Sequence, residues 1–187
     1  FGENRQSDLG LVRLLREGIT DQIDLVVDVL GAQLRWDVAT AIERFHDFEP
    51  YRLLWIEEPL PPHDLDAHVR LRNQVTTRIG TGEQEWNVEG YRRLIRAGGV
   101  DVVQLDPGRC QGITGSRQVV KMVEAENLQF TAHTWSSALN TAASVLLLAS
   151  SNHGVTMDFK PHESPMQHEL VEDPWVMQHG FLAVRDQ

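Results

Sequence analysis

The chain has 187 residues, a formal net charge of −10 and one cysteine. This length suits one domain with a sizeable core, and the acidic balance argues against nucleic acid or an anionic membrane as the main partner while leaving metal cations open. The lone Cys110 cannot form an internal disulfide, and no apolar run reaches the roughly 18 residues of a membrane span, so we expect a cytoplasmic location.

Short apolar runs alternate with amphipathic stretches along the chain. Residues 1–19 predict the end of a strand and its loop, followed by a helix. The later runs are rich in Val, Ile, Leu or Phe, as buried parallel strands are, and the stretches between them have helical spacing. The predicted strands cover 24–28, 53–57, 77–83, 100–106, 128–133 and 154–159, and the predicted helices cover 36–48, 88–99, 114–127 and 137–151. Thr114 is a possible helix cap. Strand followed by helix, repeated, predicts a parallel sheet with right-handed crossovers.

A polar residue capable of chemistry stands at the end of each predicted strand. These residues are Asp28, Glu57, Glu83, Asp106, His133 and Asp158, spaced 23 to 29 residues apart. A single acid after a strand is most often a helix cap or a turn residue. Six at one period instead favour a (β/α) barrel of the TIM type, in which strand ends converge on one mouth. An open doubly wound sheet, which would spread them along an edge, is the less favoured fold.

The first three of these residues form a candidate metal site. Carboxylates from neighbouring strands lie close together, and their ionised forms repel one another unless a cation compensates them. Hard oxygen ligands select a hard divalent ion, Mg²⁺ above all. The adjacent Glu58 points to the opposite side if the strand continues, and is expected to support the site or the fold. The alternative is pairing with Arg52 and Arg78, which lie near the beginnings of their strands.

Asp106 and His133 form a candidate acid–base pair. An Asp beside a His fixes the tautomer of the imidazole and makes it a positioned general base or acid. The alternative is a core histidine with an ordinary hydrogen bond. The position of His133 in the series of strand ends favours the catalytic interpretation.

The motifs DLVVD, WIEEPLPPHD, IGTGEQE, VDVVQLDPGRCQGIT and FTAHTWSSALN, in this order, resemble the enolase superfamily in its mandelate racemase/muconate lactonizing enzyme branch. The resemblance implies one Mg²⁺ ion and an Asp–His dyad at the residues just described. It also implies a last-strand acid that contacts the substrate carboxylate, either Asp158 or Glu163. His162 and His168 are candidates for contacting substrate hydroxyls, with a solvated loop as the alternative. The chain departs from the family pattern at Leu30, often Asn, and at Gln111, where a Gly pair is common.

The resemblance implies a Mg²⁺-dependent lyase. Such an enzyme abstracts the proton alpha to a carboxylate and eliminates water from a sugar acid through an enediolate. The alternatives are a racemase or epimerase using the same site, a catalytically inactive fragment or remnant, and a sugar-binding module. A sugar-binding module would use aromatic platforms, for which Trp55, Trp86 and Trp135 are the candidates near the mouth, although we expect Trp55 to pack in the barrel. We expect a small-molecule carboxylate substrate and a homo-oligomer, with no nucleic acid or membrane partner.

The predicted strands number fewer than the eight of a full barrel of about 250 residues. We therefore expect residues 1–187 to form a single partial barrel domain, with 159–187 as a C-terminal extension, and with the first strands and an N-terminal capping domain absent. Open edges and a missing cap predict that this chain alone is inactive, or folds only with the missing part.

Overall fold

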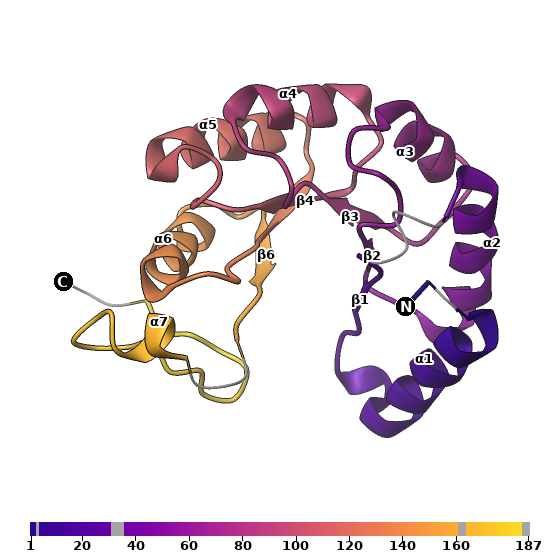
Figure 1. Cartoon of the computed structure of the whole chain (residues 1–187), viewed down its shortest axis with the longest axis horizontal. Coiled ribbons are helices and arrows are strands. Elements are labelled where there is room, and N and C mark those ends of the chain that lie inside the picture. The colour runs from indigo at the N-terminus through magenta and orange to yellow at the C-terminus, as the bar shows by residue number, and fades with distance from the viewer. Residues whose placement is uncertain (3, 31–35, 161–163, 185–187) are drawn as a thin grey trace. The chain divides into compact units, whose positions relative to one another are not determined.

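The computed structural model describes residues 1–2, 4–30, 36–160 and 164–184. Its elements alternate between strand and helix as the sequence predicts (Figure 1). The strands are β1 (Val27–Asp28), β2 (Ile56–Glu57), β3 (Ile79–Thr81), β4 (Val102–Leu105), β5 (Gln129–Ala132) and β6 (Gly154–Met157). The α-helices are α1 (Arg5–Ile19), α2 (Val38–Phe48), α3 (Leu65–Arg72), α4 (Val88–Ala97), α5 (Gly112–Ala125), α6 (Ala138–Ala149) and α7 (Pro165–His168).

The strands neighbour one another in chain order, from β1 to β6. The pairs β1–β2, β2–β3 and β5–β6 are parallel, which confirms the predicted sheet type for these strands. Each strand is shorter than the apolar run that predicted it, because the runs include flanking residues without ladder pairing. The chain divides into two compact units, residues 1–84 with 94–102, and residues 85–93 with 103–187.

The first unit holds β1, β2 and β3 with helices α1, α2 and α3. Three of its helices begin at side-chain caps, which satisfy backbone donors that the helix itself cannot pair. Asn4 accepts a hydrogen bond from the Ser7 amide at 3.0 Å, Asp37 from Thr40 at 2.8 Å and Asp64 from Ala67 at 3.0 Å. In Figure 1, α1, α2 and α3 lie along the outside of the three strands.

Helix α3 is not among the helices predicted from the sequence. Its stretch looks polar, yet His68 is fully buried and Ala67 and Leu71 are buried beside it. Burial lowers the pKa of His68, so the imidazole is held neutral, and its Nδ1 lies 2.9 Å from the Asp64 carbonyl oxygen. A neutral histidine thus takes an apolar position, which a reading by hydrophobic period does not detect.

The core of the first unit is continuous from α1 to β3. Its buried side chains are Val12, Val27, Val29, Trp36, Ala41, Phe45, Phe48, Leu53, Ile56, Leu60, Ala67, Leu71 and Ile79. The strand residues among them fix the backbone on which the strand-end carboxylates are carried. At about 25 cal/mol per Å² of apolar surface, this burial is the main stabilising contribution to the unit.

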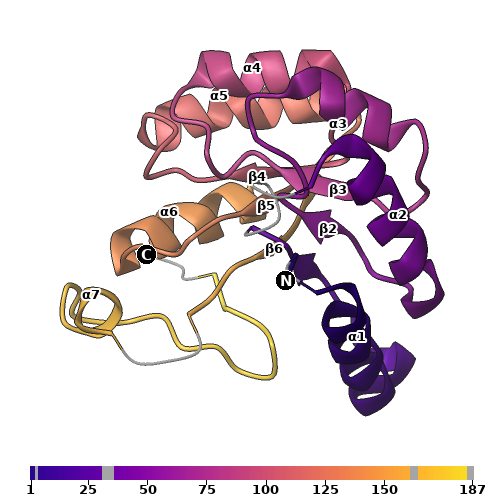
Figure 2. The same ribbon diagram turned by 45° about the vertical axis from the view of Figure 1, so that its right-hand side comes forward.

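The second unit holds β4, β5 and β6 with helices α5, α6 and α7. Helix α5 begins at Gly112 after Gln111, whose φ of 57° is left-handed, so the predicted cap at Thr114 is wrong. A turn, in which the Gly112 amide donates to the Pro107 carbonyl, starts this helix earlier. The described tail after β6 contains the short helix α7, which contacts α6 (Figure 2). Cys110 is fully buried in this unit, and burial raises its pKa to about 11.

Candidate functional site

The six predicted site residues lie at or just beyond the C-terminal ends of their strands. Asp28 and Glu57 are the last residues of β1 and β2, and Glu83 lies two residues after β3. Asp106, His133 and Asp158 each follow their strands directly. Asp28, Glu57 and Glu83 belong to the first unit and the other three to the second.

Asp28 and Glu57 are register partners on adjacent parallel strands. Glu57 is buried, with 8% of its surface exposed, and its Oε1 accepts a hydrogen bond of 2.8 Å from Trp55 Nε1. Asp28 is exposed, and its Oδ1 accepts the Leu30 amide at 2.8 Å. Trp55 itself is buried, which confirms that it packs in the core rather than forming a sugar platform.

Glu58 is a buried structural carboxylate. Its φ of 50° is left-handed, so the strand does not continue through it. Its Oε1 accepts from Thr81 Oγ1 at 2.7 Å and from the Gly82 amide at 3.2 Å, and its Oε2 accepts from Gln84 Nε2 at 2.7 Å. Burial raises the pKa of Glu58, these bonds oppose the rise, and the charge of Asp28 adds to it. Glu58 therefore binds residues on both sides of Glu83.

The chemistry of the donor set fits a hard divalent ion, since Asp28, Glu57 and Glu83 are carboxylates at the ends of consecutive strands. Across residues 1–2, 4–30, 36–160 and 164–184, however, no three His, Cys, Asp or Glu side chains stand together as a group able to hold a metal ion. The Trp55 indole engages one oxygen of Glu57.

In the second unit, Asp106 and His133 are in direct contact. His133 Nδ1 lies 2.7 Å from Asp106 Oδ2. Asp106 Oδ1 accepts from the Gly108 amide at 2.8 Å and from Asn140 Nδ2 at 3.0 Å. Burial acts to raise the pKa of Asp106, but the bonds from His133 and Asn140 outweigh it and hold the pKa below its usual value. A charged Asp106 makes Nδ1 of the neutral imidazole the donor, which leaves Nε2 as its acceptor.

Two exposed tryptophans near these strand ends carry stacked cations. The Arg109 guanidinium lies 5.4 Å from the centre of the Trp86 ring, and its Nε is 3.6 Å from Asp106 Oδ2. Lys160 Nζ lies 5.8 Å from the Trp135 ring. Such pairs contribute about 0.5–1 kcal/mol at exposed sites.

The backbone of Asp158 is fixed by two hydrogen bonds. Its amide donates to the Ala132 carbonyl at 3.0 Å, and its carbonyl accepts from the Thr134 hydroxyl. Two further predicted substrate contacts, His162 and Glu163, lie outside the described residues. His168 lies in α7, where its Nδ1 is 3.1 Å from the Ser164 carbonyl oxygen.

One residue that contacts the site was not predicted from the sequence. It is Asn140, in the most apolar helix. The signal for Asn140 was an amide side chain near the start of the largely apolar stretch SALNTAASVLLLAS. An amide at such a position is buried only where it has hydrogen-bond partners.

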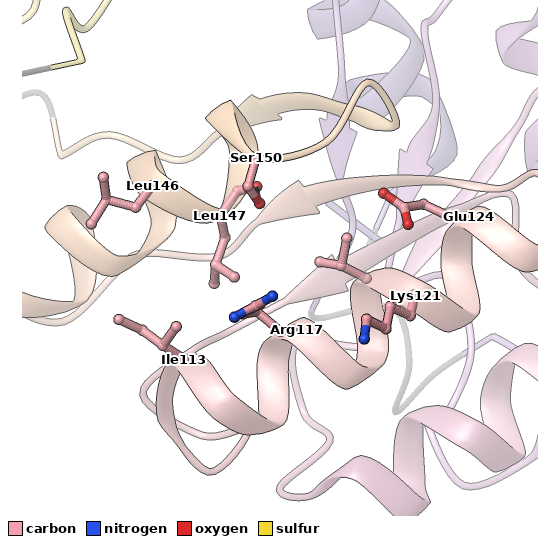
Figure 3. A pocket seen from close by; sticks show the side chains of 8 residues that line it. Ile113, Arg117, Lys121, Glu124, Leu146, Leu147 and Ser150 are labelled. Atoms are coloured by element: carbon pink, nitrogen blue, oxygen red, sulfur yellow. Dashed lines mark hydrogen bonds between the residues drawn. The ribbon is translucent and has the colours of Figure 1, made fainter.

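A pocket of about 340 Å³ lies between α5 and α6, on a different part of the second unit's surface (Figure 3). Its lining residues are Ile113, Arg117, Val120, Lys121, Glu124, Leu146, Leu147 and Ser150. Since none of the predicted site residues lines it, this pocket carries no part of the candidate chemistry.

None of the helices in the described part of the chain has the length and apolar character needed to cross a membrane.

Comparison with known proteins gives matches over the entire chain. The family model described as "Enolase C-terminal domain-like" matches residues 1–187. D-xylonate dehydratase of Haloferax volcanii is 23% identical over 93% of this chain and 42% of its own length. L-talarate/galactarate dehydratase of Salmonella typhimurium is 31% identical over 70% of this chain and 32% of its own length.

Among solved structures, a racemase from Streptomyces coelicolor with bound magnesium superposes with a TM-score of 0.87. It is 28% identical, and the match covers 100% of this chain and 49% of that one. This match confirms the predicted fold class, a partial (β/α) barrel of the TIM type. The chain spans about half or less of the length of these three proteins.

Proposed function

Because the chain belongs to the enolase C-terminal domain-like family, we propose that it carries catalytic residues of a hydro-lyase acting on a sugar acid. The reaction removes the proton next to the carboxylate and eliminates water from the adjacent carbon. The observation that best supports this is the 2.7 Å contact between His133 and Asp106 at the ends of two strands. The similarity to D-xylonate dehydratase and to L-talarate/galactarate dehydratase supports the reaction class.

His133 is the general base of the proposed reaction. Its Nδ1 faces Asp106, so its Nε2 lone pair accepts the α proton of the substrate. The electron pair of the broken C–H bond forms the enediolate of the substrate. The protonated imidazole, stabilised by Asp106, then returns its proton to the β-hydroxyl. That group leaves as water, and the resulting enol converts to a 2-keto acid.

We include one Mg²⁺ ion in the proposal, with Asp28, Glu57 and Glu83 as its ligands. When bound, such an ion supplies positive charge that stabilises the negative charge developing on the substrate carboxylate, a contribution of several kcal/mol. Glu58 contributes by fixing the loop that carries Glu83, through its bonds to Thr81, Gly82 and Gln84.

The remaining roles concern substrate binding. Asp158 is proposed to hydrogen-bond a substrate carboxylate oxygen, with Glu163 as the rival for this role, and His162 is proposed to contact substrate hydroxyls. We also propose that the protein forms a homo-oligomer, which the family resemblance supports. A cytoplasmic location is proposed because the chain has a single cysteine.

A racemase or epimerase is the second candidate function, because one of the similar structures is a racemase. In that reaction the enediolate is re-protonated at the α carbon and no water leaves. The third possibility is a chain that keeps the fold without turnover.

The test is α-proton exchange. We would incubate the full chain, and in parallel a longer protein that contains it, with aldonates and aldarates in D₂O and Mg²⁺. Proton NMR follows the loss of the α-proton signal and the appearance of a 2-keto-3-deoxy product. The His133→Asn variant should lose at least about 10²-fold in exchange rate, since a positioned base contributes roughly 10²–10⁴-fold.

The matched control is His46→Asn, which removes an exposed histidine of α2 in the first unit. It should exchange like the wild type. Exchange with a 2-keto-3-deoxy product supports the dehydratase, and exchange with inversion but no such product supports the racemase. Absence of exchange with every substrate, in both proteins, contradicts both enzymatic functions.

A further inference from the structure

We propose that Asn140 is a positioning residue for the His133–Asp106 pair. Its catalytic meaning rests on the proposed function, but its effect on the imidazole rests on geometry alone. Asn140 lies in the first turn of α6, distant in sequence from Asp106, and is buried with 6% of its surface exposed.

The orientation of the Asn140 amide is fixed by its partners. Its Oδ1 accepts from the Gly108 amide at 2.9 Å. A backbone N–H can only donate, so the atom facing Gly108 must be the oxygen and the other atom must be the NH₂ group. That group donates to Asp106 Oδ1 at 3.0 Å and lies 3.4 Å from the His133 carbonyl oxygen.

These bonds hold both oxygens of Asp106. Oδ1 receives two donors, from Gly108 and Asn140, and Oδ2 faces the imidazole at 2.7 Å. With Oδ1 held by two groups, the plane of the carboxylate cannot turn about its terminal torsion, which is otherwise broad. The direction of Oδ2 is thereby set, and with it the direction in which His133 presents Nε2.

The space around Gly108 supports the same interpretation. A Cβ atom added at Gly108 would lie 3.1 Å from Asp106 Oδ1 and 3.3 Å from Asn140 Oδ1. The loop therefore approaches these two side chains closely, and Gly108, Asp106 and Asn140 form one hydrogen-bonded group. A residue that served only to fill α6 would need none of these polar contacts.

The experiment reads the tautomer of His133 in the full chain labelled with ¹⁵N at its eight histidines. The His133→Asn variant identifies the His133 signals by their loss. At a pH where the imidazole is neutral, the wild type should show a protonated Nδ1 and an unprotonated Nε2. In Asn140→Ala and Asn140→Leu, the second tautomer should become substantially populated, because Asp106 Oδ1 keeps only the Gly108 amide as a donor and the carboxylate turns more easily.

Thr141→Val is the matched control. Thr141 neighbours Asn140 in α6, is also buried, and donates to Gln167 Oε1 at 3.2 Å rather than to the pair. This variant should keep the wild-type tautomer. If it shifts the tautomer as the Asn140 variants do, the effect is a general loosening of α6 and the proposal is wrong.

The proposal is also overturned if either Asn140 variant folds, by circular dichroism, and retains the wild-type tautomer. If neither variant folds, a measurement on the wild-type protein tests the proposal. The Nδ2 protons of Asn140 should exchange slowly with solvent, and fast exchange contradicts the proposal. The tautomer of His133 is measured without substrate, so the NMR result stands even if the proposed reaction does not occur. Likewise, the α-proton exchange result does not depend on the role of Asn140.

Discussion

Glu58 illustrates at the residue scale how a carboxylate can be structural while its neighbour is a candidate ligand. Glu57 and Glu58 are adjacent in sequence, yet Glu57 ends a strand and Glu58 turns into the left-handed region. The difference lies in their hydrogen-bond partners, because Glu58 accepts bonds from Thr81, which ends β3, and from Gly82 and Gln84 in the loop that follows. The alternation of side chains along a strand predicted different roles for the two carboxylates, but it could not identify the residues that donate to Glu58.

We predict that Glu58→Ala lowers the free energy of unfolding by about 2–4 kcal/mol, because it leaves buried donors of the β3 loop without their acceptor. Urea denaturation at neutral pH measures the change. Glu17→Ala, an exposed residue of α1, should change it by less than about 0.5 kcal/mol. Equal effects of the two substitutions would show that the bonds to Glu58 contribute nothing net.

At the scale of elements, two helices contain glycines in opposite surroundings. In α1, a Cβ at Gly10 meets nothing within 4 Å, whereas in α5 a Cβ at Gly115 would lie 2.1 Å from the Cys110 carbonyl oxygen. The first glycine lowers helix propensity without a packing reason. The second allows the backbone before α5 to approach the helix closely.

Gly10→Ala should therefore raise the free energy of unfolding by about 0.5–1 kcal/mol. Gly115→Ala should lower it by about 1–3 kcal/mol. Thermal and urea unfolding of the two variants measure the difference. A loss of stability in Gly10→Ala, or a gain in Gly115→Ala, would contradict the packing described for these helices.

The strand–helix alternation and the six strand-end residues were predictable because both depend on local sequence period. The existence of β1 to β6 and of α2, α4, α5 and α6 followed from short apolar runs and amphipathic spacing. Helix α3 was not found, because buried His68 takes an apolar position while reading as polar. The contact of Glu58 with Thr81 joins residues 23 apart in sequence, and that of Asn140 with Asp106 joins residues 34 apart, so only the folded chain brings these together.

At the scale of the whole molecule, the net charge of −10 affects how metal binding must be measured. Any divalent cation relieves general repulsion in such a chain, so a stabilising effect of Mg²⁺ is not by itself evidence for a site. A specific site adds stability by RT ln(1 + [L]/Kd), about 2.7 kcal/mol at 100 times the dissociation constant.

We predict that Mg²⁺ at saturating concentration raises the Tm of the chain by about 5 °C above KCl of equal ionic strength. The double variant Glu57→Gln/Glu83→Gln should lose this increment, whereas Glu17→Gln should retain it. Differential scanning calorimetry provides the measurement. The same increment in the double variant would remove Glu57 and Glu83 from the proposed ligand set.

The burial of Cys110 has a consequence for following the chain's motions. The thiol is fully buried and its pKa is about 11, so neither contact with a reagent nor ionisation occurs readily in the folded second unit. As the sole cysteine of the chain, it gives one reaction whose rate reports one event. Alkylation of Cys110 requires the structure to open around the start of α5. The rate of alkylation therefore measures how often the segment that carries Asp106 and Gly108 opens.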